Sequence, residues 1–148
     1  MSERIYIRNG TLVTMNDADE MVFGGSVVIE GDRIVDVGPD VEVAARQSTD
    51  GAVVIDAEGK AVLPGLVDLH FHTAVGKGWS DHLPLWEYLE TCWYPIIRAL
   101  SPEEAYWAAL ASYSESIKCG VTTVNDMYRQ LPSLARAAEE IGIRAVLS

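Results

Sequence analysis

Two histidines of the chain are separated by one residue, directly after the apolar run 61–69. Side chains alternate between the two faces of a β-strand, so His70 and His72 are expected to point the same way while Phe71 points the other way. Two neighbouring imidazoles at the end of a buried strand can hold one divalent transition metal. The same spacing also suits two ordinary histidines near a strand end. The surrounding elements are therefore needed to decide between a metal site and two histidines that bind no metal.

The run 61–69 opens an alternating series of strands and helices. Its nearly continuous apolar character is typical of a strand buried on both faces, as in a parallel sheet or barrel. The patterns that follow predict a helical segment over 83–100, a helix over 102–118, a strand over 121–126, a helix over 132–140 and a strand over 143–148. Right-handed βαβ units of this kind build parallel sheets, either open or closed into a barrel.

Local signals mark where the helices begin and end. Ser101 can cap a helix, Pro102 suits the first helical position, and Glu104 completes a capping box. Gly120 is expected to end this helix in the left-handed conformation. Pro95 should kink or divide the preceding helical segment, because it lacks the N–H that the helix needs there.

Residues 3–57 have the pattern of a small all-β module. The dipeptides Asn9-Gly10 and Gly31-Asp32 predict two turns. Around them we expect one or two helical turns near residues 41–47 and strands over 5–8, 11–15, 26–30, 33–37 and 52–56. The module contains no His, no Cys and no clustered carboxylates, so we expect its role to be structural.

Composition disfavours several classes of partner and location. Lys and Arg number 11 against 22 Asp and Glu, and the net charge of −11 disfavours nucleic acid and anionic membranes as partners. Cys92 and Cys119 fit neither a zinc knuckle nor a disulfide framework, so free thiols are expected. The chain has neither a signal-peptide pattern nor an apolar run of ~18 residues, and we expect a cytoplasmic protein.

The series of strands and helices stops on the apolar strand 143–148. A parallel sheet of three strands that ends on a bare edge is a poor stopping place for a fold. We therefore expect this chain to be part of a longer fold that is truncated, split or cleaved.

Four stretches in sequence order resemble the amidohydrolase superfamily, in particular its branch of guanine, cytosine and S-adenosylhomocysteine deaminases and s-triazine hydrolases. Residues 64–72 resemble the first barrel strand of that family, and residues 81–89 are similar to its D-D-L-P-L-x-x-W-L segment. Residues 100–104 keep the register, and residues 120–128 resemble its G-T-T-T-x-x-D-M-Y strand. Each motif alone is weak, but four in order are a specific signal.

The resemblance implies an α/β fold, namely the first strands of a (β/α)8 TIM barrel preceded by a small β-sandwich module. Residues 1–59 would be the N-terminal part of the sandwich, and residues 60–148 the first β/α units of an incomplete barrel. His70 and His72 would be two ligands of one Zn²⁺ or Fe²⁺ per complete site. The family's other ligands and its proton-shuttling Glu follow later strands, so no catalytic residue is expected within this chain, and His82 is not expected to be a ligand.

The implied reaction is the hydrolytic removal of an amino or chloro substituent from a small nitrogen heterocycle by metal-activated water, since a bound divalent ion lowers the pKa of water toward ~7. One alternative is hydrolysis of a cyclic amide or imide ring. Another is a non-catalytic structural subunit or inactive fragment, which the early stop at Ser148 motivates. The chain alone is expected to be inactive. The remaining barrel segment or a second subunit is the expected partner, and a homo-oligomer is expected.

Trp79, Ile97 and Asp126 are the predicted substrate-binding residues. Trp79 lies in the loop after the metal strand, and Ile97 stands where several members of the branch carry a substrate-binding Glu, which argues against nucleoside-like substrates. Asp126 ends the second strand of the predicted barrel, where it could orient a ligand or cap the following turn. Trp86 and Trp93 could wall a pocket for an aromatic substrate, but their spacing equally suits a helix packing stripe, which we favour.

Overall fold

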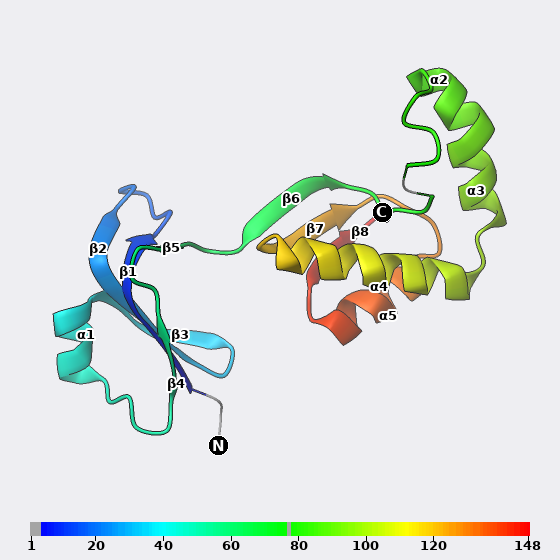
Figure 1. The fold of residues 1–148 in the computed structure, drawn as a ribbon. Coiled ribbons are helices and arrows are strands. Elements are labelled where there is room, and N and C mark those ends of the chain that lie inside the picture. Colours follow the sequence, from blue (N-terminus) through cyan, green and yellow to red (C-terminus); the bar gives the residue numbers. More distant parts are fainter. Residues whose placement is uncertain (1–3, 77) are drawn as a thin grey trace. The chain divides into compact units, whose positions relative to one another are not determined.

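The computed structural model describes residues 4–76 and 78–148. The chain is a mixed α/β protein with two separate β-sheets (Figure 1). It divides into two compact units, Met1–Pro64 and Gly65–Ser148, and each unit has its own sheet. Among the described residues, no helix is long and apolar enough to cross a membrane. Both cysteines are free thiols, as predicted.

The first unit consists of β1 (Arg4–Val13), β2 (Met21–Glu30), β3 (Arg33–Pro39), α1 (Asp40–Arg46), β4 (Val53–Asp56) and β5 (Ala61–Val62). The strand order is β3-β2-β1-β4, with β1 antiparallel to β2 and parallel to β4, and the short β5 also pairs with β1. Tyr6, Val28 and Val43 form the buried core of this unit. The predicted hairpin at Gly31-Asp32 is confirmed, because it joins β2 to the antiparallel β3.

The predicted turn at Asn9-Gly10 is wrong, because both residues lie within the single strand β1. Before the pair formed by Gly10 and Gly25, two residues of β1 face one residue of β2, which is a β-bulge. Asn9 adopts a φ of 61° in this bulge, a conformation that asparagine tolerates. A Cβ on Gly10 would lie 2.7 Å from a methyl carbon of Val62, so the close approach of β5 requires this glycine.

The apolar run 61–69 is not the single strand that its sequence predicts. Its start is β5 in the first sheet, and its end belongs to β6 (Leu66–Phe71) in the second sheet. Pro64 lies between them and has no N–H for a ladder hydrogen bond. Gly65 packs so closely on Thr122 that a Cβ would lie 2.1 Å from the threonine hydroxyl oxygen. Burial on both faces is also not observed, since Leu69 is 75% exposed on a strand at the edge of its sheet.

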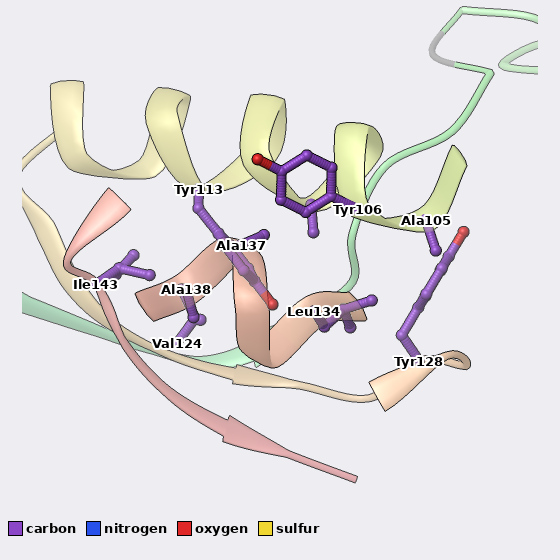
Figure 2. Packing of buried hydrophobic residues seen from close by; sticks show 10 residues of the cluster. Ala105, Tyr106, Tyr113, Val124, Tyr128, Leu134, Ala137, Ala138 and Ile143 are labelled. Carbon is purple, nitrogen blue, oxygen red and sulfur yellow. The ribbon is translucent and has the colours of Figure 1, made fainter. Parts of the chain in front are cut away.

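The second unit contains a parallel sheet in the order β6-β7-β8, with β7 spanning Val121–Asp126 and β8 spanning Arg144–Leu147. Two helices, α4 (Pro102–Lys118) and α5 (Leu131–Ile141), pack on one face of this sheet (Figures 1 and 2). The core between helices and sheet includes Ala109, Tyr113, Val124, Leu134 and Ala137. The predicted order of strand, helices, strand, helix and strand in a parallel sheet is therefore confirmed.

The predicted helical segment 83–100 is helical over 85–99 but irregular next to Pro95. It forms α2 (Leu85–Tyr88), a π-helical turn η1 (Leu89–Trp93) and α3 (Tyr94–Ala99). The π-helical turn ends two residues before Pro95, which cannot donate an N–H to the preceding turn. Single π-helical turns inside helices occur frequently at functional sites, and residues of this segment line the cavity beside His70 and His72.

The predicted boundaries of α4 are confirmed by its terminal contacts. The Ser101 hydroxyl accepts a hydrogen bond from the Glu104 N–H (3.2 Å), and the Glu104 carboxylate accepts one from the Ser101 N–H (2.9 Å). This reciprocal pair is the capping box. Gly120 follows the helix with a φ of 84°, the left-handed conformation that stops it.

Candidate metal site

His70 and His72 lie on the same face at the carboxyl end of β6, as their spacing predicts. Their ring centroids are 5.0 Å apart with the ring planes nearly perpendicular. Phe71 points to the other face, where its ring lies 5.8 Å from that of Tyr113 in α4. His70 is exposed and His72 is partly buried. Both imidazoles are therefore accessible, and they are close enough together to share one ion.

The orientation of His72 is fixed by a backbone carbonyl. Its Nδ1 lies 2.9 Å from the carbonyl oxygen of Met127, which follows β7 directly. A carbonyl oxygen only accepts, so Nδ1 carries the proton and donates. The lone pair of His72 is then on Nε2, which is the usual arrangement of a histidine that binds a metal.

The donor chemistry of this pair fits a transition metal, but the pair does not complete a site. Two neutral imidazoles suit Zn²⁺ or Fe²⁺, which normally need further nitrogen, oxygen or sulfur ligands. Within residues 4–76 and 78–148, no group of three or more His, Cys, Asp or Glu residues could hold a metal ion. The described residues therefore provide two ligands at most.

A cavity of about 770 Å³ lies against the two histidines. Its other walls come from the loop after β6, from the segment α2–η1–α3, and from Met127. Aromatic rings dominate the helical wall, where Tyr88, Trp93 and Tyr94 face the cavity. The volume is in the range of pockets that bind small molecules.

Trp93 connects this wall to the histidine pair. Its ring meets that of His72 edge-on at 5.9 Å and that of Tyr128 at 5.7 Å. The side chain thus lines the cavity and also packs on a neighbouring buried ring. Trp86, by contrast, is 72% exposed. Their spacing alone predicts one common packing role, because no local signal in the sequence marks the π-helical turn that separates them.

The structure places the three predicted substrate-binding residues in different surroundings. Trp79 is 70% exposed, and its ring packs beside Gly76 in the loop after β6. Ile97 is partly buried and packs against the core of the second unit. Asp126 is fully buried. Contact of these side chains with a substrate stays a prediction.

Asp126 accepts three hydrogen bonds behind the histidine pair. Thr73 donates both its N–H (3.1 Å) and its hydroxyl (2.6 Å) to the Asp126 carboxylate, and the Tyr113 hydroxyl donates a third bond (2.8 Å). Burial, together with the adjacent Asp126 carboxylate, raises the pKa of Tyr113 well above its ordinary value. Tyr113 therefore remains a protonated donor throughout the neutral range.

A family model described as "Amidohydrolase family" matches residues 61–148 of the chain. The chain is also 36% identical to a protein of Halothermothrix orenii named 5-methylthioadenosine/S-adenosylhomocysteine deaminase. That alignment covers 98% of this chain and 34% of the relative. The chain thus spans about a third of the length of the curated relatives it matches.

Two zinc-bound solved structures have similar folds. An adenosine deaminase from Xanthomonas campestris with bound zinc superposes with a TM-score of 0.86 at 25% identity, over 95% of this chain and 32% of that chain. An atrazine chlorohydrolase from Arthrobacter aurescens complexed with zinc superposes with a TM-score of 0.77 at 25% identity, over 95% of this chain and 34% of that chain. Similarity to zinc proteins agrees with the imidazole pair described above.

Proposed function

The chain belongs to the amidohydrolase family, and from this premise we propose that it contributes a metal-binding histidine pair and one wall of the substrate pocket to a metal-dependent hydrolase. The hydrolase would remove an amino or chloro substituent from a small nitrogen heterocycle. The observation that carries the proposal is the position of His70 and His72, on one face and at the wall of a cavity of about 770 Å³.

The fold that we propose for the complete enzyme is a (β/α)8 barrel that is preceded in the sequence by part of a small β-sandwich. Residues 60–148 would form the first strands and helices of the barrel, and residues 1–59 would form part of the sandwich, except that β5 (Ala61–Val62) pairs with β1 and so belongs to the sandwich side. The parallel sheet β6-β7-β8, with α4 and α5 on one face, supports the first assignment. Such barrels carry their active sites at the carboxyl ends of their parallel strands. The histidine pair lies at the carboxyl end of β6, which agrees with this location.

His70 and His72 would hold one Zn²⁺, or Fe²⁺, together with ligands from the segments that complete the barrel. The bound ion would supply a nucleophile at neutral pH by lowering the pKa of water toward ~7. The contribution of this chain is orientation. The Met127 carbonyl keeps the His72 proton on Nδ1, and the edge of Trp93 limits the movement of the His72 ring.

The pocket wall favours a flat, aromatic substrate. Rings of Tyr88, Trp93 and Tyr94 offer stacking surfaces, and such pairs contribute about 0.5–1.5 kcal/mol beyond the burial of area. Removal of an amino group is supported by the names of the relatives, which are deaminases. Removal of chloride is supported by the similarity to an atrazine chlorohydrolase.

The proposal is tested with the complete protein, purified without added metal. We expect about one zinc or iron per active site, loss of turnover after treatment with a strong chelator, and recovery when zinc is restored. Aminopurines, aminopyrimidines and chloro-s-triazines form the substrate panel, with release of ammonia or chloride as the measurement. Turnover that survives complete removal of metal would contradict the proposal, and a protein with neither metal nor turnover would instead support the non-catalytic alternative.

A further inference from the structure

We propose that Asp126 is a positioning residue, which holds the His72 imidazole in its metal-binding orientation without touching metal or substrate. This inference rests on the proposed function in so far as His72 is a ligand. It comes from a set of hydrogen bonds between the end of β6 and the end of β7.

Four hydrogen bonds join three consecutive residues of one segment to two consecutive residues of the other. The Met127 N–H donates to the Phe71 carbonyl (3.2 Å), and His72 Nδ1 donates to the Met127 carbonyl (2.9 Å). Thr73 donates through its N–H (3.1 Å) and its hydroxyl (2.6 Å) to the Asp126 carboxylate. We call these five residues the clasp. His72 is the middle one of the three residues, so the bonds of Phe71 and Thr73 fix its backbone and the place from which its ring reaches the Met127 carbonyl.

The clasp is anchored to helix α4. The Tyr113 hydroxyl donates to the Asp126 carboxylate (2.8 Å), and the adjacent Ser112 hydroxyl accepts from the Ala74 N–H (3.0 Å). Figure 2 shows Tyr113 reaching from α4 toward the strands. Thr73, Tyr113 and Asp126 are all completely buried, so bulk water cannot replace a bond that is lost.

The hydrogen bonds of the buried side chain favour a carboxylate at position 126. Its two oxygens accept three bonds, from two donors of Thr73 and one of Tyr113. An asparagine of the same size has only one oxygen, which the Thr73 N–H requires because an N–H cannot accept. Its NH2 group would then face the hydroxyls of Thr73 and Tyr113, and both would have to turn their protons away and accept instead. Asp126→Asn therefore replaces charge-assisted bonds by weaker neutral ones with little change of volume, and the clasp loosens.

The chain provides a matched control on the same helix. Tyr106 is also buried, and its hydroxyl donates to the carboxylate of Glu140 in α5 (2.6 Å). Tyr106→Phe and Tyr113→Phe thus each remove one hydroxyl that is bonded to a carboxylate. Only the Tyr113 change reaches the clasp.

The test uses the complete protein and measures zinc affinity by competition with a chromophoric chelator. Loss of the partner that orients a metal-binding histidine typically lowers affinity 10–100-fold. We expect a loss of about tenfold or more in Asp126→Asn, a smaller loss in Tyr113→Phe, and wild-type affinity in Tyr106→Phe. Tyr113→Phe keeps the proposal testable if Asp126→Asn does not fold.

A second measurement separates positioning from general stability. Nitrogen-15 NMR of the His72 imidazole in the metal-free protein should show protonated Nδ1 in the wild type and a mixture of tautomers in Asp126→Asn. An unchanged tautomer in that variant, or an equal loss of zinc affinity in all three variants, would overturn the role of Asp126. A wild-type protein that binds no zinc would instead refute the proposed function, while the NMR result would still decide whether Asp126 positions His72.

Discussion

His70 and His72 are the two metal ligands that we propose within residues 4–76 and 78–148. Their rings share one face at the end of β6, with centroids 5.0 Å apart. The bond from His72 to the Met127 carbonyl could not be predicted, because it depends on the register between β6 and β7 and on irregularities in that pairing. The residue types thus define the possible ligands, and the tertiary contact defines which nitrogen is available.

Replacing either histidine should remove the metal while the fold is kept. We expect His70→Ala and His72→Ala to reduce the metal content of the complete enzyme from about one ion per site to a small fraction. Each variant removes one ligand of a four-coordinate ion, and the loss of a single ligand greatly lowers metal affinity. The measurement is metal analysis after gel filtration, with circular dichroism to verify folding.

The matched control is His82→Ala, since His82 is exposed and is not a predicted ligand. It should keep the metal content and turnover of the wild type. Full metal occupancy and turnover in either His70→Ala or His72→Ala would show that the ligands lie elsewhere.

Among the secondary-structure elements, the segment α2–η1–α3 has an irregularity whose position follows from the local sequence, whereas its π-helical form does not. Pro95 predicts a kink or a division, and the helix runs on over 85–99 but contains a π-helical turn just before this proline. In the π-helical turn an additional residue changes the face that later side chains occupy. A uniform helical period predicts that Trp86 and Trp93 lie on one packing stripe. In the structure they do not, and of the two it is Trp93 that lines the cavity.

The start of α4 offers a test of local stabilisation. Ser101→Ala removes the hydroxyl that accepts from the Glu104 N–H, and loss of such a cap lowers the free energy of unfolding by about 1 kcal/mol. Ser116→Ala is the control within the same helix, because the Ser116 hydroxyl bonds back to the Ser112 carbonyl and does not cap the helix start. Urea denaturation should show a lower midpoint for Ser101→Ala than for Ser116→Ala, and equal midpoints would contradict a stabilising role of the capping box.

At the scale of the whole chain, the sequence predicted the order of elements better than their division between sheets. Apolar periodicity and capping residues predicted the parallel series β6, α4, β7, α5 and β8, because these signals are local. The Asn9-Gly10 bulge and the separation of β5 from β6 were missed, because both depend on contacts with distant residues. Likewise Trp93, Tyr113 and Met127 acquire their places at the site only through tertiary contacts.

The first of the two compact units is expected to lose stability in acid, because it contains a carboxylate with a lowered pKa. In the first unit, the Asp36 carboxylate in β3 accepts from Arg46 Nη2 (2.9 Å) and Nε (3.0 Å) in α1, and from Gln47 (3.0 Å). The Arg46 hydrogen bond, followed by that of Gln47, lowers the pKa of Asp36 from 3.8 to about 2. Because the folded-state pKa is lowered, the stabilisation is fully present above 3.8 and is lost as the pH falls through about 2.

Asp36→Asn should therefore lower the thermal unfolding midpoint at neutral pH, and the curves of variant and wild type should converge as the pH approaches 2. Asp32→Asn is the control, because the contact of Asp32 with Arg33 is long (3.7 Å) and joins two exposed side chains, which contributes little. Zinc affinity at neutral pH should be unchanged in both variants, since Asp36 and the histidine pair belong to different compact units. A constant difference in midpoint across this pH range would show that Asp36 stabilises the unit through something other than its charge.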